Sequence, residues 1–432
     1  MLKYSFESNL TMKEEDTDPY NVWRDYYLGI QGLFYFAQGV AMGALFFLTA
    51  FLDYLSLDVF GRIVIQAVIW APWYLKVIFG LLSDNVPIRK YGRRKPYIFA
   101  AGILGAIGWI TLGTHTVFGV LLIASGILAS LGTSMSDAVI DALAVDITPP
   151  KRRGAMQGVS WGSRGLGVGI SAIAVGLMAD QNIWFIIYAI PGIIVSFSTF
   201  LVLLFKEKPL PETFKGVSIP EFTYQFKQRN TQLCLVFQIF AGAGLAILPI
   251  MQVFLDEGVG FDNTTIGIIF MVFSVGMFTG ALVFGLLGDR ISVRTTLPLT
   301  TVIYVAIIFT VLFMNLSIMQ TAMIFFFFVG FSNGGYEATQ MRISMDYSPR
   351  IVSGTMYNLY NSLSNLGQIA IGAIAIAALV EVLQSYQIGW QVASVFLLVG
   401  LYIGHVLVSR YRPVGVKDDQ DYPLPEVPQF ED

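Results

Sequence analysis

Four ionisable side chains lie inside apolar runs of the sequence, where an unpaired charge is costly. They are Lys76, Asp137, Arg164 and Glu337. Each lies eight to ten residues from the end of its run. At ~1.5 Å of rise per helical residue, that spacing puts all four about 12–15 Å deep, near the middle of a ~30 Å hydrocarbon layer. Such a group costs ~2.5–3.5 kcal/mol on insertion scales, so we expect all four to face the interior and to be functional.

The two cations and the two carboxylates suit different tasks at one site. Lys76 and Arg164 can bind an anionic group of a substrate, with arginine able to bind in a bidentate manner. Asp137 and Glu337 are the candidates for proton or cation coupling, because burial favours a neutral carboxyl group while a nearby cation opposes that effect. The alternative is that Lys76 with Asp137, or Arg164 with Glu337, form permanent buried pairs that only fix the packing.

Polar and aromatic side chains recur at helical spacing around these charges. As a group they suit a flat or polyhydroxylated ligand that stacks and accepts hydrogen bonds. Each one alone is equally well explained as an interhelical hydrogen bond or a packing aromatic. The candidate substrate-binding residues of this kind are Trp73, Trp161, Gln38, Asn358 and Asn361.

The composition places these residues in a membrane protein. Apolar residues make up 55% of the chain and charged residues 13%, and the mean hydropathy is +0.66. Soluble proteins average roughly 45–50% and 25%. The single cysteine, Cys234, excludes a disulfide framework and a Cys/His metal cluster. We expect no metal, no cofactor and no nucleic-acid partner. No group of nucleophile, base and orienting residue is apparent, so an enzyme is not expected.

Twelve apolar runs are long enough to cross a bilayer, which takes about 20 residues each. Lys and Arg concentrate after the even-numbered runs and in the central loop, whereas the opposite connections are acidic, so both termini are expected to be cytoplasmic. The prediction is an all-α, multi-pass cell-membrane protein that is monomeric. The runs lie near 27–50, 61–82, 96–114, 117–141, 155–179, 184–205, 232–255, 264–287, 296–314, 317–340, 355–379 and 389–409.

The runs divide into two halves of six that repeat each other. FGLLSD at 79–84 returns as FGLLGD at 284–289, and the pattern D-x-[ST]-P-x-x-x-x-G-x-M starts at both Asp146 and Asp346. Parallel repeats of six spans place a binding cavity between the halves, near the bilayer midplane. We therefore expect two pseudo-symmetric six-helix bundles at 27–205 and 232–409. Cytoplasmic segments are expected at 1–26, 206–231 and 410–432.

Residues 80–97, GLLSDNVPIRKYGRRKPY, resemble the G-x-x-x-D...G-R-R/K signature of the major facilitator superfamily. GLLGDR at 285–290 resembles its weaker second copy but lacks the RRKPY tail. The S-D-x-x-P-I and R-R-K-P-Y elements, with Lys76 upstream, resemble those of folate-biopterin transporters. They are less similar to the glycoside-pentoside-hexuronide symporters. SDAVIDA at 136–142 also resembles an element of muropeptide permeases.

The resemblance implies a latch that holds the cytoplasmic side shut, built in this chain by Gly80, Asp84, Gly92 and Arg93. The sequence itself adds basic and acidic residues that end neighbouring helices and can reach across the same loops. Asp141, nearer the cytoplasmic end than Asp137, is interpreted as a further gate residue. The alternative is that the basic run is only a topology signal. The added gate candidates are Arg94, Asp146, Asp289 and Arg290.

These features predict a secondary active transporter that works by alternating access. Its substrate is expected to be a small organic anion or a compound of the pteridine or sugar-acid type, moved with a proton or another cation. One alternative is a neutral sugar or muropeptide permease, in which Lys76 and Arg164 would be structural. Another is a membrane receptor or assembly factor that keeps the fold without transport.

The unequal copies of the repeated motif give a testable ranking of two gate residues. Because only the first copy carries the full basic loop, replacing Asp84 with alanine should reduce transport more than replacing Asp289 with alanine. Initial uptake rates of the two variants in reconstituted vesicles, normalised to protein amount, measure the difference. Equal losses would contradict the ranking.

Overall fold

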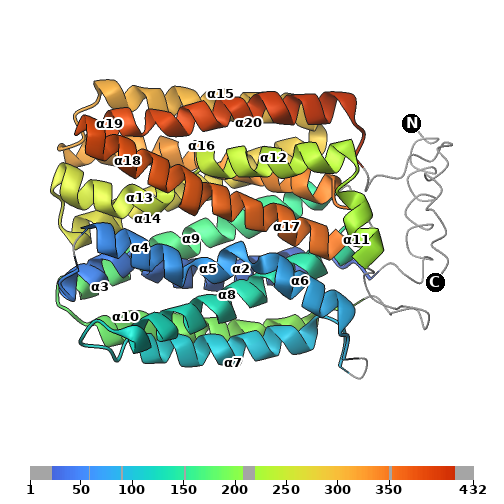
Figure 1. Cartoon of the computed structure of the whole chain (residues 1–432), viewed down its shortest axis with the longest axis horizontal. Coiled ribbons are helices and arrows are strands. Elements are labelled where there is room, and N and C mark those ends of the chain that lie inside the picture. Colours follow the sequence, from blue (N-terminus) through green and yellow to red (C-terminus); the bar gives the residue numbers. More distant parts are fainter. Residues whose placement is uncertain are drawn as a thin grey trace, which may run out of the picture.

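The computed structural model describes residues 22–57, 59–88, 91–149, 152–207, 219–349 and 353–413. Helices running along the long axis of the molecule build this part of the chain (Figure 1). The expectation of an all-α fold is thereby confirmed. In the first half of the sequence the helices are α2 (Tyr27–Phe46), α3 (Leu48–Tyr54), α4 (Val59–Ile69), α5 (Ala71–Tyr74), α6 (Lys76–Asn85), α7 (Lys95–Leu112), α8 (Val120–Ile147), α9 (Arg153–Ala179), α10 (Trp184–Ser198) and the 3-10 helix η2 (Thr199–Leu204).

The second half follows the short helix α11 (Ile219–Gln225) and contains two π-helical segments, η3 and η6. Its elements are α12 (Arg229–Gly244), α13 (Ile247–Val253), η3 (Phe254–Val259), α14 (Asn263–Arg290), α15 (Val293–Thr310), η4 (Val311–Phe313), α16 (Met319–Asp346), α17 (Ser353–Asn365), η6 (Leu366–Gly372), α18 (Ala373–Leu383), α19 (Tyr386–Gly389) and α20 (Gln391–Arg410).

Ten helical stretches in the described part of the chain are long and apolar enough to cross a membrane. Two of the twelve expected spans are not among them. The second expected span is divided into α4, α5 and α6, and the tenth, α16, has 28 residues but carries polar side chains such as Asn333, Glu337 and Gln340. The count of twelve therefore stays a prediction.

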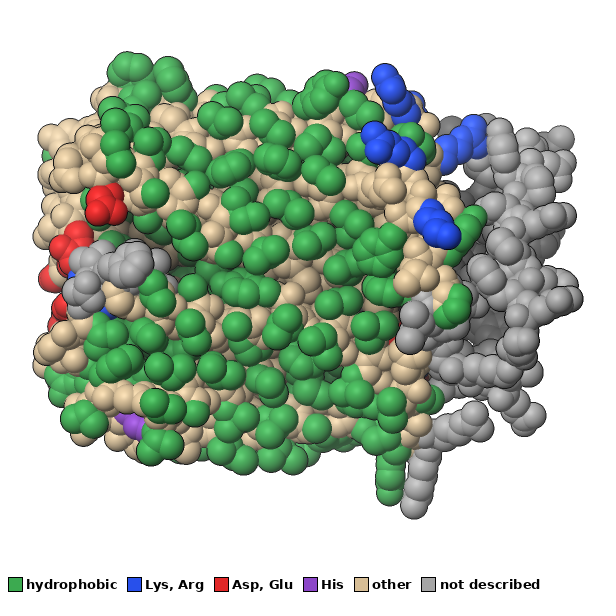
Figure 2. Space-filling view, in the orientation of Figure 1, with side chains coloured by type: hydrophobic (Ala, Val, Ile, Leu, Met, Phe, Trp, Pro, Cys, Tyr) green, Lys and Arg blue, Asp and Glu red, His purple; other side chains and the backbone are tan. Residues whose placement is uncertain are grey.

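Charge is separated along the long axis. Figure 2 shows Asp and Glu side chains at one end of the visible face, Lys and Arg at the other, and a broad hydrophobic surface between them. A surface of that kind suits lipid contact over the middle of the molecule. The separation agrees with the unequal distribution of basic and acidic residues between the expected connections.

The second expected span is broken just before the buried residue Lys76. Pro72 lies in the first turn of α5, directly after the break at Trp70 that separates α4 from α5. A second break at Leu75 separates α5 from α6. Proline has no N–H to donate to the preceding helical turn, which accounts for the first of these breaks. Lys76 then begins α6 with a buried side chain. The second break thus starts a new helix at the residue that carries the charge.

The helix α9 packs along both α2 and α14, and α17 packs on α6 and α8. These are contacts between distant parts of the chain, since α2, α6, α8 and α9 belong to the first half of the sequence and α14 and α17 to the second. The contact between the halves therefore runs along α9 with α14 and along α6 and α8 with α17. The division into two six-helix bundles stays a prediction.

Glycines let the backbones of α2 and α9 touch at the level of Arg164. A methyl group added at Gly39 would lie 2.1 Å from the carbonyl oxygen of Arg164, and one added at Gly167 would lie 2.2 Å from that of Phe36. Contacts this short do not occur, so any larger residue must force the helices apart. Close helix approach at small residues is the usual way to pack helices in lipid.

This contact predicts different effects of one substitution at two positions of α2. Gly39→Ala should lower stability by about 1–3 kcal/mol through overpacking. Gly29→Ala is the matched control, because no atom lies within 4 Å of the added methyl group. Thermal unfolding of the purified variants measures both effects. A Gly39→Ala variant as stable as the control would contradict the close approach.

Candidate functional site

One carboxylate is shared by two buried cations at the centre of the candidate site. Asp137 on α8 forms ion pairs with Lys76 of α6 through one oxygen and with Arg164 of α9 through the other. All three side chains are buried. Three of the four predicted ionisable residues thus lie at one level. The pair of Lys76 with Asp137 that the alternative named is present, whereas Arg164 pairs with Asp137 and forms no ion pair with Glu337 in the described part of the chain.

Aromatic rings and an amide complete the surroundings of the cations. The guanidinium carbon of Arg164 lies 4.5 Å from the ring centre of Tyr35 and 4.4 Å from that of Trp161. Its Nη2 donates to Gln38 Oε1 at 2.6 Å. The ammonium of Lys76 lies 4.7 Å from the Trp73 ring. Cation–π contacts of this kind gain strength when water is excluded.

Glu337 differs from the other carboxylates of the site. It is buried on α16 and forms no hydrogen bond or ion pair with the described residues. Arg164 and Lys76 act on it only electrostatically, at longer range. A buried carboxyl group without a bonded partner is costly as an anion. Among the carboxyl groups of the site, Glu337 is therefore the one that its neighbours hold least firmly.

Asp141 belongs to the site as well as to the boundary between the halves. It lies one helical turn after Asp137 on α8, where the Tyr35 hydroxyl donates to one of its oxygens. Asn361 Nδ2, from α17 of the other half, donates to the second oxygen at 3.2 Å. The sequence placed Asp141 nearer the gate but missed Tyr35, whose spacing of three residues from Gln38 was the available signal.

The two predicted asparagines are engaged with α8. Asn358 Nδ2 donates to the carbonyl oxygen of Ala138 at 3.0 Å, next to the contact of Asn361 with Asp141. Both amides act as interhelical hydrogen bonds in this conformation, which is the alternative that the sequence left open. Their role in substrate binding stays a prediction.

Several hydrogen-bond donors of the site are buried without a partner in the described part of the chain. They come from two indoles, one amide and one guanidinium. Buried donors are normally paired, so a group of unpaired ones favours a ligand that supplies acceptors. The donors are Trp73 Nε1, Trp161 Nε1, Gln38 Nε2 and Arg164 Nε.

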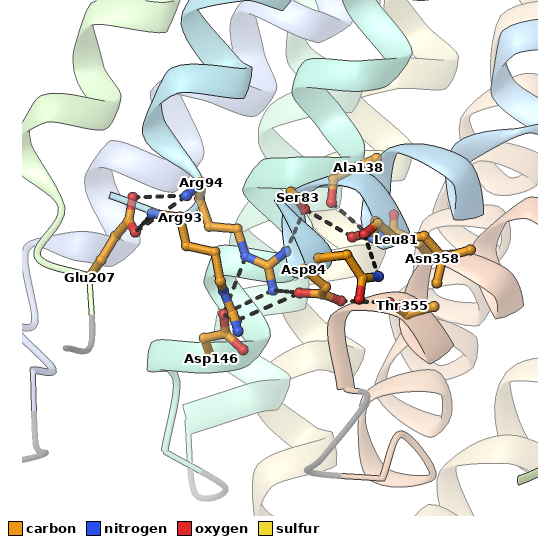
Figure 3. Close-up of polar contacts among 12 residues, drawn as sticks. Leu81, Ser83, Asp84, Arg93, Arg94, Ala138, Asp146, Glu207, Thr355 and Asn358 are labelled. Atoms are coloured by element: carbon orange, nitrogen blue, oxygen red, sulfur yellow. Dashed lines mark hydrogen bonds and ion pairs between the residues drawn. The ribbon is translucent and has the colours of Figure 1, made fainter. Parts of the chain in front are cut away.

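Predicted latch residues from the first copy of the motif form one network at the C-terminal ends of α6 and α8 (Figure 3). Arg94 Nη2 lies 2.7 Å from Asp84 Oδ1 and 3.1 Å from Asp146 Oδ2. Arg93 also pairs with Asp146 and lies 3.8 Å from Asp84. Thr355 of α17 donates to Asp84 Oδ2 at 2.5 Å, which joins the network to the other half.

Glu207 belongs to this network although the sequence analysis missed it. Its carboxylate accepts the backbone N–H groups of Arg93 at 2.7 Å and Lys95 at 2.9 Å, at the start of α7. A carboxylate at a helix N-terminus is favourable. Its only sequence signal was an acidic residue inside the basic stretch KEK after the sixth expected span.

Two glycines of the signature fit tight positions in this network. Gly92 has φ +106°, a conformation that other residues rarely adopt, and a methyl group there would lie 2.8 Å from Glu207. A methyl group at Gly80 would lie 3.1 Å from Asn358 Nδ2. Both glycines therefore permit contacts that a side chain would obstruct.

The second copy of the motif is arranged differently. Arg290, at the end of α14, is exposed and forms no ion pair with the described residues. The side chain of Asp289 lies outside the described part. Asp346, the counterpart of Asp146, pairs across the halves with Arg153 at 3.4 Å. The expected asymmetry between the copies thus agrees with the contacts of Asp346 and Arg290, while the gating roles stay predictions.

Polar contacts also join the halves at the opposite end. Arg62, which the sequence analysis did not assign to the site, is buried and pairs with Glu257 at 2.9 Å and Asp53 at 3.3 Å. Asp180 accepts from Thr264 Oγ1 at 2.5 Å at the start of α14. In the same turn, hydrogen bonds from Thr265 hold the pKa of Asp262 below its usual value.

Comparison with known families and proteins gives consistent matches. A model of the BT1 family matches residues 36–409. A folate-biopterin transporter of Synechocystis sp. (strain ATCC 27184 / PCC 6803 / Kazusa) is 26% identical over 224 residues, 49% of this chain and 44% of that protein. Probable folate-biopterin transporter 4 of Arabidopsis thaliana is 30% identical over 137 residues, 30% of this chain and 28% of that protein. The chain thus spans less than half the length of either relative.

Solved structures match the fold over most of the chain. The major facilitator superfamily transporter FucP, crystallised in the outward conformation, matches with a TM-score of 0.67 at 13% identity, covering 89% of this chain and 99% of that one. The human organic anion transporter MFSD10 (TETRAN) matches with a TM-score of 0.68 at 12% identity, covering 87% and 98%. These matches establish the fold of the major facilitator superfamily.

The shared carboxylate predicts that Asp137 and Glu337 differ in their effect on stability. Asp137→Asn leaves two buried cations without a counter-ion and should destabilise the protein by about 3–5 kcal/mol. Adding Lys76→Met to that variant should restore part of the loss. Glu337→Gln, which breaks no bond, is the control and should unfold close to wild type. Thermal unfolding in detergent measures all three, and a stable Asp137→Asn variant would contradict the shared pairing.

Proposed function

The chain belongs to the BT1 family, and from that premise we propose that it moves a small organic anion or a compound of the pteridine or sugar-acid type. It is a multi-pass membrane protein with the fold of major facilitator superfamily transporters, and its family identifies it as a transport protein rather than an enzyme. The names of the Synechocystis and Arabidopsis relatives support a pteridine-containing substrate.

The observation that carries this proposal is the sharing of Asp137 by Lys76 and Arg164. A carboxylate or phosphate of the substrate competes with Asp137 for one of the two cations. Arg164 then binds the anion with its guanidinium while Trp161 and Tyr35 offer ring faces beside it. The unpaired donors of Trp73 and Gln38 supply hydrogen bonds to the acceptor atoms of a heterocycle.

Glu337 is the proposed carrier of the coupling proton. If Asp137, Asp141 and Glu337 were all ionised beside Lys76 and Arg164, the dry interior would hold one excess negative charge. A bound proton removes that excess at low cost. Asp137 is held by two cations and Asp141 by two donors, so Glu337 is the group left to exchange the proton.

The proposed transport cycle is alternating access by a monomer in the cell membrane. In it, bundles at 27–205 and 232–409, with twelve spans in total, rock about the central site, and both termini lie in the cytoplasm. The separation of basic from acidic residues between the two ends supports this orientation (Figure 2). The network of Asp84, Arg93 and Arg94 serves as the cytoplasmic latch, and Thr355 is its point of contact with the second half.

A second candidate is a neutral sugar or muropeptide permease. The same ion pairs favour it to a lesser degree, because Asp137 and Gln38 already satisfy much of the hydrogen bonding of Lys76 and Arg164. In that case the cations are structural and the substrate contacts the aromatic rings and amides. The two candidates differ in whether anionic probes compete with transport.

Uptake by reconstituted vesicles tests the proposed function. An inward proton gradient should drive uptake of folic acid, biopterin or gluconate by the wild-type protein, whereas glucose should not be taken up. Glu337→Gln should abolish gradient-driven uptake and retain exchange of labelled for unlabelled substrate, since the proton is no longer needed in exchange. Glu381→Gln, an exposed glutamate of α18, is the matched control.

Each outcome has a distinct meaning. Full gradient-driven uptake by Glu337→Gln would contradict the assignment of the proton. Uptake of glucose but of none of the anions would favour the neutral permease. Transport of none of the four probes by the wild type would contradict the proposed substrate classes.

A further inference from the structure

We propose that Tyr35 is a positioning residue that links occupancy of the central site to closure of the cytoplasmic side. This inference rests on the proposed transport function and adds the path by which the site acts on the gate. The path runs from Arg164 through Tyr35 and Asp141 to Asn361. It therefore begins at a cation of the site and ends on α17 of the other half.

Tyr35 contacts the site with its ring and the gate region with its hydroxyl. The ring centre lies 4.5 Å from the guanidinium carbon of Arg164, and the hydroxyl donates to Asp141. The side chain is fully buried on α2. A rigid ring couples its two ends, so a shift of the ring away from Arg164 must also move the hydroxyl.

Asp141 receives one donor from each half of the protein. Tyr35 of α2 bonds one oxygen, and Asn361 of α17 bonds the other at 3.2 Å. The tyrosine bond fixes the orientation of the carboxylate and thereby aims its second oxygen at Asn361. Charge-assisted hydrogen bonds of this kind are directional and stronger than neutral ones.

This contact differs from three neighbouring contacts of α17 with the first half. Asn358 and Asn365 donate to the backbone carbonyls of Ala138 and Trp73, and Ser362 accepts from the backbone N–H of Val77. Backbone groups cannot rotate when a ligand arrives. The contact between Asp141 and Asn361 joins two side chains, and one of them is held by a residue of the site.

The arrangement gives ligand binding a direct mechanical consequence. An anion that takes Arg164 from Asp137 draws the guanidinium away from its present position against Tyr35. The ring follows, the hydroxyl leaves Asp141, and the carboxylate loses the orientation that holds Asn361. One interhelical bond between the halves is thereby weakened, and the cytoplasmic side opens more readily.

A labelling experiment in nanodiscs tests the link without any ligand. The reporter is Val145→Cys in a Cys234→Ala background, because Val145 is buried in a small cluster with Met345 and Tyr357 of the other half. A maleimide reaches this cysteine only when the cytoplasmic side opens. Tyr35→Phe keeps the ring and removes the hydroxyl. The labelling rate should then rise about tenfold, because losing one charge-assisted hydrogen bond shifts the equilibrium toward the open state by about that factor.

The matched control is Tyr304→Phe, which removes a buried hydroxyl that accepts from Asn333 at 3.0 Å within the second half. It should change the labelling rate by no more than about twofold, because the bond that it removes does not cross between the halves. Asn361→Ala should raise the rate as Tyr35→Phe does, and the double variant should go no further. A Tyr35→Phe rate equal to that of the parent, or additive effects of the two substitutions, would overturn the proposal.

Folic acid then separates this inference from the proposed function. It should accelerate labelling of the parent and have little further effect on Tyr35→Phe, although the variant still binds it. Equal acceleration in both proteins would overturn the link through Tyr35. If the wild type neither takes up folic acid nor labels faster in its presence, the pteridine proposal is wrong, while the ligand-free comparison still decides the role of the Tyr35 hydroxyl.

Discussion

Asp137 holds two cations from two different helices, and the interior is organised around that contact. Bringing three charged groups out of water costs several kcal/mol per ion unless each is paired and hydrogen-bonded. The aromatic rings beside Lys76 and Arg164, together with Gln38, offset part of that cost. A substrate that offers its own anion replaces an existing partner and need not bring a new charge pair into the interior.

Polar contacts between the halves lie at both ends of the molecule. One end uses Asp84 with Thr355 and Arg153 with Asp346, and the opposite end uses Arg62 with Glu257. Each such bond contributes about 1–3 kcal/mol at most. Differences of that size allow modest differential binding to shift the balance between conformations.

The sequence predicted the level of the buried charges along their helices, but it did not predict which side chains they contact. Counting residues along helices placed Lys76, Asp137 and Arg164 at one level, and the ion pairs confirm it. Pairing depends on how each helix is rotated about its axis, which spacing along one helix does not contain, so the pairing of Arg164 with Asp137 was not predicted. Tyr35 and Glu207 were missed because their partners lie more than a hundred residues away.

Glu207 has a consequence for the connection between the two halves. This residue lies where the chain leaves the first half, and it is tied to the backbone of Arg93 and Lys95. The tether that joins the halves therefore starts at the latch itself and not at the end of the preceding helix. Because Arg93 and Arg94 pair with Asp84 and Asp146, a displacement of Glu207 acts first on those two arginines.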